Sequence, residues 1–211
     1  MTATNIIYEL LERMGLMMHF GRGDKASKTE TMFVPGYGRT YDEGNTDRFP
    51  VDGDGFIDFY TIFPYLGSKI SSDSTDDADI DNRIVQASKM FGYLRKNVLF
   101  SKRLTNATKK LLYESYVLSI QLFGSEIWRL NAASLAKLES FHRGIVRAMA
   151  RTTTYITWKN HTSAFELEKR FGLRGIKSYI AENALRWLGH VPDPSNSPAN
   201  TLLEVRYAVG T

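Results

Sequence analysis

The 211-residue chain contains no cysteine. This absence excludes disulfides, thiolate zinc sites and cysteine nucleophiles. The chain also lacks an apolar run of the roughly 18 to 20 residues that a membrane-spanning helix requires. Glu9, Glu12 and Arg13 interrupt the first apolar stretch, which does not fit a secretory signal. We therefore expect a soluble, unsecreted protein of the cytoplasm or nucleus, without a membrane partner.

Motifs of common catalytic sites are missing as well. The sequence has no G-x-S-x-G serine motif, and its glycine pairs lack the third glycine of a dinucleotide site. The spacing of the histidines matches no metal motif such as H-E-x-x-H, so each is expected to be a surface or packed imidazole: His19, His142, His161 and His190. The sequence therefore predicts neither a self-contained catalytic residue set nor a cofactor in this chain.

One acidic stretch, "DGDGFID" at residues 52–58, is similar to a calcium-binding loop. Such a loop needs oxygen ligands at positions 1, 3 and 5, a glycine at 6 and a bidentate glutamate at 12. Alignment on Gly55 places Pro50 at position 1 and Thr61 at position 12. Neither residue can supply the required ligand, so we interpret the stretch as an acidic loop without calcium.

Charge is distributed unequally along the chain. Residues 1–81 hold 7 Lys/Arg and 15 Asp/Glu, a net of −8, whereas residues 82–211 hold 20 and 8, a net of +12. The basic part is a candidate for contact with a polyanion. The alternative is that these cations are ordinary solvated helix faces.

The first part of the chain predicts a small α+β region. Apolar spacing over residues 5–16 indicates a helix that Gly15 ends. The stretch "TMFVPG" favours a strand closed by Pro35 and Gly36, and residues 36–55 are typical of a long loop. Aromatic and β-branched residues over 56–70 predict paired strands, with Gly67 at a bulge or a close backbone approach.

From residue 80 the pattern is helical. Three helices are expected over about 80–98, 105–128 and 132–149, the last capped by Asn131. Their predicted buried stripes are Ile80, Ile84, Ala87, Phe91, Leu94 and Val98, then Leu112, Tyr116, Ile120 and Phe123, then Leu135, Leu138, Phe141, Ile145 and Met149. Ser163 and Glu166 match a capping box before a short helix that ends at Gly172, and a last helix follows within residues 175–191. The predicted fold is α+β and mostly helical.

Several basic residues of this helical part lie off the predicted stripes. Arg83, Lys89, Arg95 and Lys96 belong to the first helix. Arg143, Arg147 and Arg151 are four residues apart, so we expect one row of positive charge on the third helix. By default Trp128, Trp158 and Trp187 are interpreted as packing residues, although base stacking is an alternative.

Quoted in chain order, four stretches resemble the C-terminal part of reverse transcriptases from non-LTR retrotransposons: "GLMMHFGRGDKASKTETMF", "FPYLGSKISSDSTDDADIDNRIVQASKMFGYLRKNV", "LYESYVLSIQLFGSEIWRLNAASLAKLESFHRGIVRAMA" and "ALRWLGHV". The resemblance spans roughly residues 3–191. It implies a partial palm over residues 1–78 with a lysine loop, a long insertion loop and a primer-grip-like hairpin. A basic thumb-like helical bundle over residues 79–191 and a tail over residues 192–211 would follow.

In this family a Tyr-x-Asp-Asp turn and an upstream aspartate hold two catalytic metal ions. Those ions activate the primer 3′ oxygen and neutralise the transferred phosphoryl group. The sequence resembles the part that follows this turn, so Mg²⁺ is expected only in a full-length family member. Lys28 resembles the lysine of the family's palm loop, and Tyr65, Leu66, Gly67 and Ser68 resemble the primer grip.

The resemblance therefore implies a truncated reverse-transcriptase-like protein that contacts a template–primer duplex, with no polymerase activity of its own. The missing palm and fingers portion is a second expected partner. The alternatives are a non-catalytic basic nucleic-acid-binding module and a functionless structural remnant. The residues expected to bind nucleic acid are Lys28, Tyr65, Leu66, Gly67, Ser68, Arg83, Arg95, Lys96, Arg143, Arg147 and Arg151.

Overall fold

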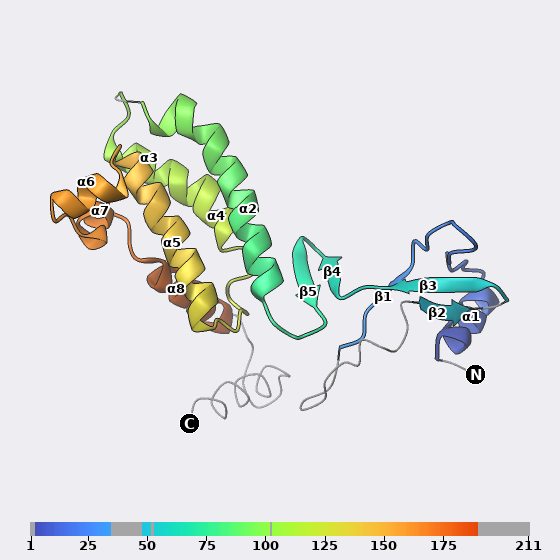
Figure 1. Cartoon of the computed structure of the whole chain (residues 1–211). Coiled ribbons are helices and arrows are strands. Elements are labelled where there is room, and N and C mark those ends of the chain that lie inside the picture. Colours follow the sequence, from blue (N-terminus) through green and yellow to red (C-terminus); the bar gives the residue numbers. More distant parts are fainter. Residues whose placement is uncertain (1–2, 35–47, 52, 102, 190–211) are drawn as a thin grey trace. The chain divides into compact units, whose positions relative to one another are not determined.

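The computed structural model describes residues 3–34, 48–51, 53–101 and 103–189. The fold is α+β and mostly helical, as predicted (Figure 1). The chain divides into two compact units, residues 1–79 and 80–211, which are described separately below. No helix in the described ranges has the length and apolar character needed to cross a membrane.

The first unit begins with helix α1, Ala3–Arg13, followed by Gly15 at a φ of 72°. A positive φ of this kind ends helices and favours glycine, so the predicted helix end is confirmed. The apolar side chains Ile6, Ile7 and Leu10 are exposed. The amphipathic pattern therefore predicted the helix correctly, but most of its apolar face is left uncovered.

The three-stranded sheet of this unit has the order β1–β3–β2. Strand β3, Gly55–Phe59, pairs in parallel with β1, Glu30–Thr31, and antiparallel with β2, Arg48–Val51. Its small core consists of Val51, Phe56 and Ile57. The prediction of a continuous loop over residues 36–55 is wrong for Arg48–Val51. Pro50 is tolerated there because β2 is an edge strand.

In the calcium-like stretch Gly53 and Asp54 lie in a turn, whereas Gly55–Asp58 belong to β3, so the interpretation as a loop is wrong for that part. Gly53 has a φ of 66°, and Asp54 lies 3.6 Å from the guanidinium of Arg22. Asp58 approaches the guanidinium of Arg48 at 3.3 Å. These two carboxylates therefore neutralise separate cations. Asp52, Pro35 and Gly36 lie outside the described residues.

Strands β4, Ile62–Tyr65, and β5, Ser68–Ser71, form a separate antiparallel hairpin, which confirms the paired strands predicted for this stretch. The register pairs Tyr65 with Ser68, leaving Leu66 and Gly67 as a two-residue turn. Within β5 the backbone amide of Lys69 donates a 2.9 Å hydrogen bond to the carboxylate of Asp79, the last residue of the first unit.

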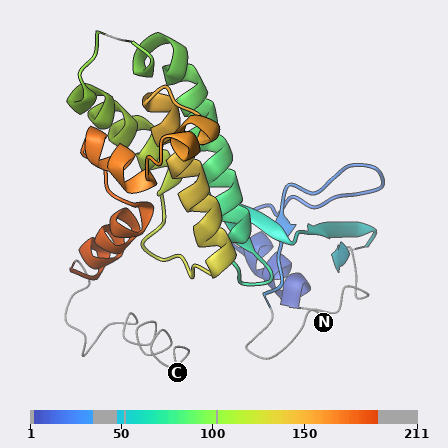
Figure 2. The same cartoon turned by 60° about the vertical axis from the view of Figure 1, so that its left-hand side comes forward.

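The second unit is a helical bundle. Its elements are α2 Asp77–Leu94, the π-helical turn η1 Arg95–Leu99, α3 Asn106–Leu112, the π-helical stretch η2 Tyr113–Leu118, α4 Ser119–Gln121, α5 Ala132–Met149, α6 Thr154–Lys159, α7 Ala164–Phe171 and α8 Ile176–Gly189. Helices α2 and α5 lie side by side and are joined by a 2.8 Å ion pair between Asp81 and Lys137 (Figures 1 and 2). The core of this unit includes Ile80, Leu99, Tyr113, Leu138 and Ile176.

Local helix signals were predicted reliably. The side chain of Asn131 accepts a 2.8 Å hydrogen bond from the Ser134 amide and caps α5. Ser163 and Glu166 form both hydrogen bonds of a capping box, at 3.1 and 2.7 Å. Gly172 follows α7 with a φ of 68°, as predicted. These features depend on residues close in sequence, which is why the sequence reveals them.

The stripe predicted over residues 105–128 is only partly correct, because Leu112 and Ile120 pack against the core but the other two residues do not. Tyr116 and Phe123 are exposed, whereas Tyr113, Val117 and Leu122 are buried. The cause is the π-helical stretch η2, which shifts the hydrogen-bonding register relative to the α-helical period assumed. The regular helical segment also ends earlier than predicted, at Gln121.

Candidate nucleic-acid interface

The predicted binding residues fall in both units. In the first unit Lys28 is exposed, and its backbone amide donates a 3.0 Å hydrogen bond to Nδ1 of His19. Lys28 precedes β1 of the three-stranded sheet, whereas Tyr65, Leu66, Gly67 and Ser68 form the tip of the separate β4–β5 hairpin. The structure therefore gathers the four hairpin residues and leaves Lys28 apart from them, in the bend before β1.

The hairpin tip has an unusual backbone. Leu66 has a φ of 47° and Gly67 a φ of 88°. Positive φ at both central residues is the pattern of a type I′ turn, which normally favours Asn-Gly. Gly67 is thus needed for its φ, and not for the predicted bulge or a close approach within the chain, because a Cβ there would meet nothing within 4 Å. The side chain of Leu66 is 82% exposed, so the turn projects an apolar group outward.

Arg83 does not occupy the position predicted for it. Arg83 is 8% exposed, and its guanidinium carbon lies 4.3 Å from the centroid of the Phe123 ring. The prediction that it lies off the buried stripe is wrong, because the side chain is buried within the bundle. A buried guanidinium packed on an aromatic ring is poorly placed to reach a phosphate.

Arg95 and Arg151 are brought together by Phe100. Their guanidinium carbons lie 4.9 and 5.7 Å from the centroid of this ring. Both residues are exposed, and neither forms a salt bridge within the described part of the chain. The sequence did not predict Phe100 as the organising residue, because the contact joins segments about fifty positions apart. The side chain of Lys96 lies outside the described residues.

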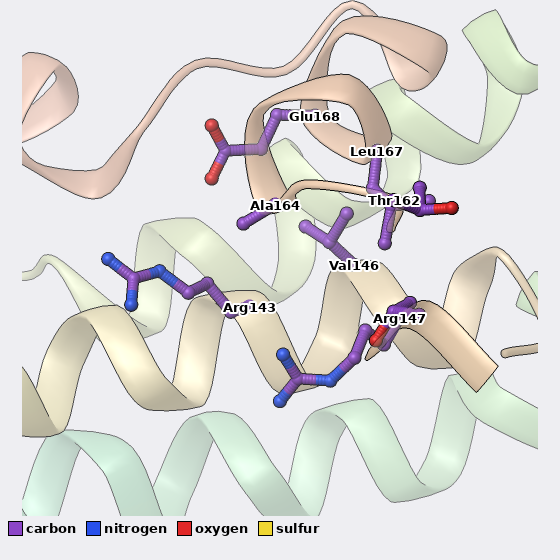
Figure 3. Close-up of a pocket in the computed structure, with 8 residues that line it drawn as sticks. Arg143, Val146, Arg147, Thr162, Ala164, Leu167 and Glu168 are labelled. Atoms are coloured by element: carbon purple, nitrogen blue, oxygen red, sulfur yellow. The ribbon is translucent and has the colours of Figure 1, made fainter. Parts of the chain in front are cut away.

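The predicted row of three arginines on α5 is only partly correct. Arg143 is paired with Glu139 at 2.6 Å, and Arg147 follows one turn later. Figure 3 shows Arg143 extending from α5 on the side of Glu168 and Arg147 extending away from Glu168. Arg151 lies beyond the end of α5, with a φ of 55°, so it leaves the helical row and turns toward Phe100.

A small cavity lies between α5, α6 and α7. Its volume is about 30 Å³, and its polar lining comprises Arg143, Arg147, Thr157, Thr162 and Glu168 (Figure 3). This volume is close to that of one water molecule. A nucleotide therefore cannot enter the cavity, and any phosphate would contact these arginines from outside.

A buried polar cluster holds α5 against its neighbours. The hydroxyl of Tyr113 lies 2.6 Å from Nδ1 of His142, and Nε2 of the same ring lies 3.6 Å from Oε1 of Glu168. Burial lowers the pKa of His142 to about 4, with the backbone carbonyl of Arg174 opposing the shift and the charge of Arg143 adding to it. Burial also raises the pKa of Glu168. His142 is therefore neutral at pH 7, and this approach is not an ion pair.

The default interpretation of the tryptophans as packing residues holds for Trp128, which is 6% exposed, but fails for Trp158, which is 73% exposed. Tyr155 on the same helix is also exposed, and the centroids of the two rings are 6.3 Å apart. Their spacing of three residues in a segment without acidic residues was the sequence signal for this pair.

Among the described residues, no cluster of three His, Asp or Glu side chains is arranged to hold a metal ion. A scan against protein-family models and searches of curated proteins and of solved structures found no match to this chain.

Proposed function

We propose that this chain acts as the end of the palm and the thumb of a non-LTR retrotransposon reverse transcriptase. It contacts the template–primer duplex and leaves the catalytic metal ions to aspartates outside its own sequence. Two things support the proposal: the ordered stretches of sequence that resemble this family, and a helical unit whose exposed arginines come from separate segments. The hairpin tip at Tyr65–Ser68 contributes a second, sequence-independent contact.

The observation that carries the binding proposal is the convergence of Arg95 and Arg151 on Phe100. Two guanidinium groups on one ring repel each other unless an anion lies nearby. A phosphate backbone supplies such anions at regular spacing, and Arg147, in the last turn of α5, lies four residues before Arg151 in sequence. Phosphate contacts of this kind position a duplex without reading its sequence.

The test is binding of a fluorescein-labelled RNA–DNA duplex, followed by fluorescence anisotropy at low salt. The variant Arg95→Gln/Arg147→Gln/Arg151→Gln is expected to bind at least about tenfold more weakly, because each phosphate contact adds to the affinity. Lys137→Gln/Lys177→Gln/Arg186→Gln removes the same charge from cations that already have carboxylate partners, and it is the matched control. Equal losses in both variants, or no binding by the unaltered chain, would refute the proposal.

The absence of an autonomous polymerase site is tested separately by primer extension with Mg²⁺ or Mn²⁺. The proposal expects no template-dependent incorporation by the purified chain. Incorporation that persists after repeated purification would overturn this part and require two metal-binding carboxylates within the chain.

A further inference from the structure

Helix α6 presents two large aromatic side chains to solvent. Tyr155 is 66% exposed and Trp158 is 73% exposed, and no residue of this helix is buried. The planes of the two rings are inclined by 35°, so they do not stack on one another. Because aromatic side chains gain stability from burial, such exposure is not explained by packing within the unit.

The helix that carries these rings is fixed in place by its polar residues. The hydroxyl of Thr153 accepts a 3.2 Å hydrogen bond from the Ile156 amide and caps the helix. Thr157 lines the small cavity beside Arg147, so this side of α6 faces α5. Tyr155 and Trp158, three positions apart, share another side of the helix. The two rings are therefore held outward before any ligand arrives.

The sequence segment that carries the rings is positively charged. Residues 140–165 contain no Asp or Glu. Arg151 precedes α6, and Lys159 lies four positions after Tyr155, on the same side of the helix. Both cations are exposed. The platform formed by Tyr155 and Trp158 thus combines exposed aromatic faces with exposed positive charge in the same segment.

We propose that Tyr155 and Trp158 bind unpaired bases of a single-stranded nucleic acid by stacking, while Arg151 and Lys159 contact the adjacent phosphates. The inference rests on the proposed function for the class of ligand and adds a single-stranded segment to it. Bases in a duplex already stack on their neighbours, so only unpaired bases offer a free face to these rings. A protein partner could also bury the rings, but the exposed cations of this segment favour a polyanion, which makes a protein the weaker alternative.

The variants separate aromatic stacking from folding. Trp158→Ala and Tyr155→Ala remove one ring each, and Trp158→Phe keeps an aromatic face. Tyr116→Ala removes an exposed ring from η2 and is the matched control. Because α6 has no buried residue and Tyr116 is exposed on η2, all four variants are expected to keep the thermal unfolding midpoint of the unaltered chain, as checked by circular dichroism.

Three labelled probes are compared by fluorescence anisotropy: a single-stranded oligothymidylate, a duplex of the same length, and an abasic deoxyribose-phosphate chain. Trp158→Ala is expected to weaken oligothymidylate binding about tenfold, in line with stacking energies for single bases. Trp158→Phe retains most of the affinity, and Tyr116→Ala retains all of it. Affinity for the duplex and the abasic chain changes less than about twofold in every variant, because neither probe offers unpaired bases.

The other possible outcomes decide against either the stacking site or the proposed duplex contact. Unchanged oligothymidylate binding by Trp158→Ala, or an equal loss for the abasic chain, overturns the stacking site. Conversion of a dimer to a monomer by Trp158→Ala, with nucleic-acid binding intact, assigns the rings to a protein interface and also overturns it. Ring-dependent binding of oligothymidylate without any duplex binding supports the stacking site and refutes the proposed duplex contact.

Discussion

The hydroxyl of Tyr113 and Nδ1 of His142 lie 2.6 Å apart inside the core of the helical unit, and both side chains are almost completely buried. Because His142 is neutral at pH 7, the phenol and Nδ1 share one hydrogen bond, whose donor depends on the tautomer of the ring. This bond joins η2 to α5. It therefore links the irregular stretch of the bundle to the helix that carries Arg143 and Arg147.

Tyr113→Phe removes the hydroxyl and leaves the buried Nδ1 of His142 without its partner. Such a loss costs about 1 to 3 kcal/mol of unfolding free energy. Urea unfolding followed by circular dichroism measures it. Tyr116→Phe, which alters an exposed tyrosine in the same segment, should change stability by less than about 0.5 kcal/mol. Similar values for the two variants would contradict the assigned hydrogen bond.

The buried imidazole also predicts how stability depends on pH. The pKa of His142 falls from 6.5 in the unfolded chain to about 4 in the fold. Between these values the unfolded chain binds more protons, so stability is complete above pH 6.5 and declines as the pH falls toward 4. The full loss is on the order of 3 kcal/mol. The raised pKa of Glu168 acts in the opposite direction, with its contribution declining as the pH rises above 4.5.

Urea unfolding at a series of pH values between 4 and 7 tests this dependence. His142→Gln should flatten the profile, since the titrating group is gone, whereas His161→Gln at an exposed position should leave it unchanged. A profile that is equally steep in both variants would assign the pH dependence to other groups.

The turn of the β4–β5 hairpin predicts opposite effects at adjacent positions. Leu66→Asn should stabilise the hairpin by about 1 kcal/mol, because asparagine tolerates positive φ better than leucine. Gly67→Ala should cost roughly 1 to 2 kcal/mol for the same reason. Hydrogen exchange of the amides in β4 and β5 reports the local stability. Leu66→Ala is the control and should have little effect, since alanine and leucine have the same steric cost at a positive φ.

Sequence reasoning succeeded where the cause is local and failed where it depends on distant contacts. Asn131 and Ser163 cap helices through bonds to residues three positions away, and these were predictable. The burial of Arg83 depends on its contact with Phe123, forty positions later. The pattern of nearby residues therefore predicted its position wrongly. Arg151 left its predicted row because α5 ends at Met149, where the sequence contains neither glycine nor proline as a stop signal.

The candidate site shows the same limit. The individual arginines were predicted, but Phe100, which gathers Arg95 and Arg151, was not. His142 gave a usable signal, because it falls between Leu138 and Ile145 on the buried side of α5. A polar residue at such a position must find a partner, yet the sequence could not identify Tyr113 as that partner, because η2 changes the helical register.

The salt dependence of duplex binding gives the number of phosphate contacts directly. Each contact releases condensed counterions, so the slope of log K against log salt concentration is about −0.9 per contact. If Arg95, Arg147 and Arg151 each meet one phosphate, the triple glutamine variant should have a slope shallower by about 2 to 3. The matched variant of Lys137, Lys177 and Arg186 should keep a slope close to that of the unaltered chain, because those cations already have carboxylate partners. If the slope of log K against log salt concentration becomes equally shallow in both variants, binding depends on net charge alone. The arrangement of arginines around Phe100 then does not determine binding.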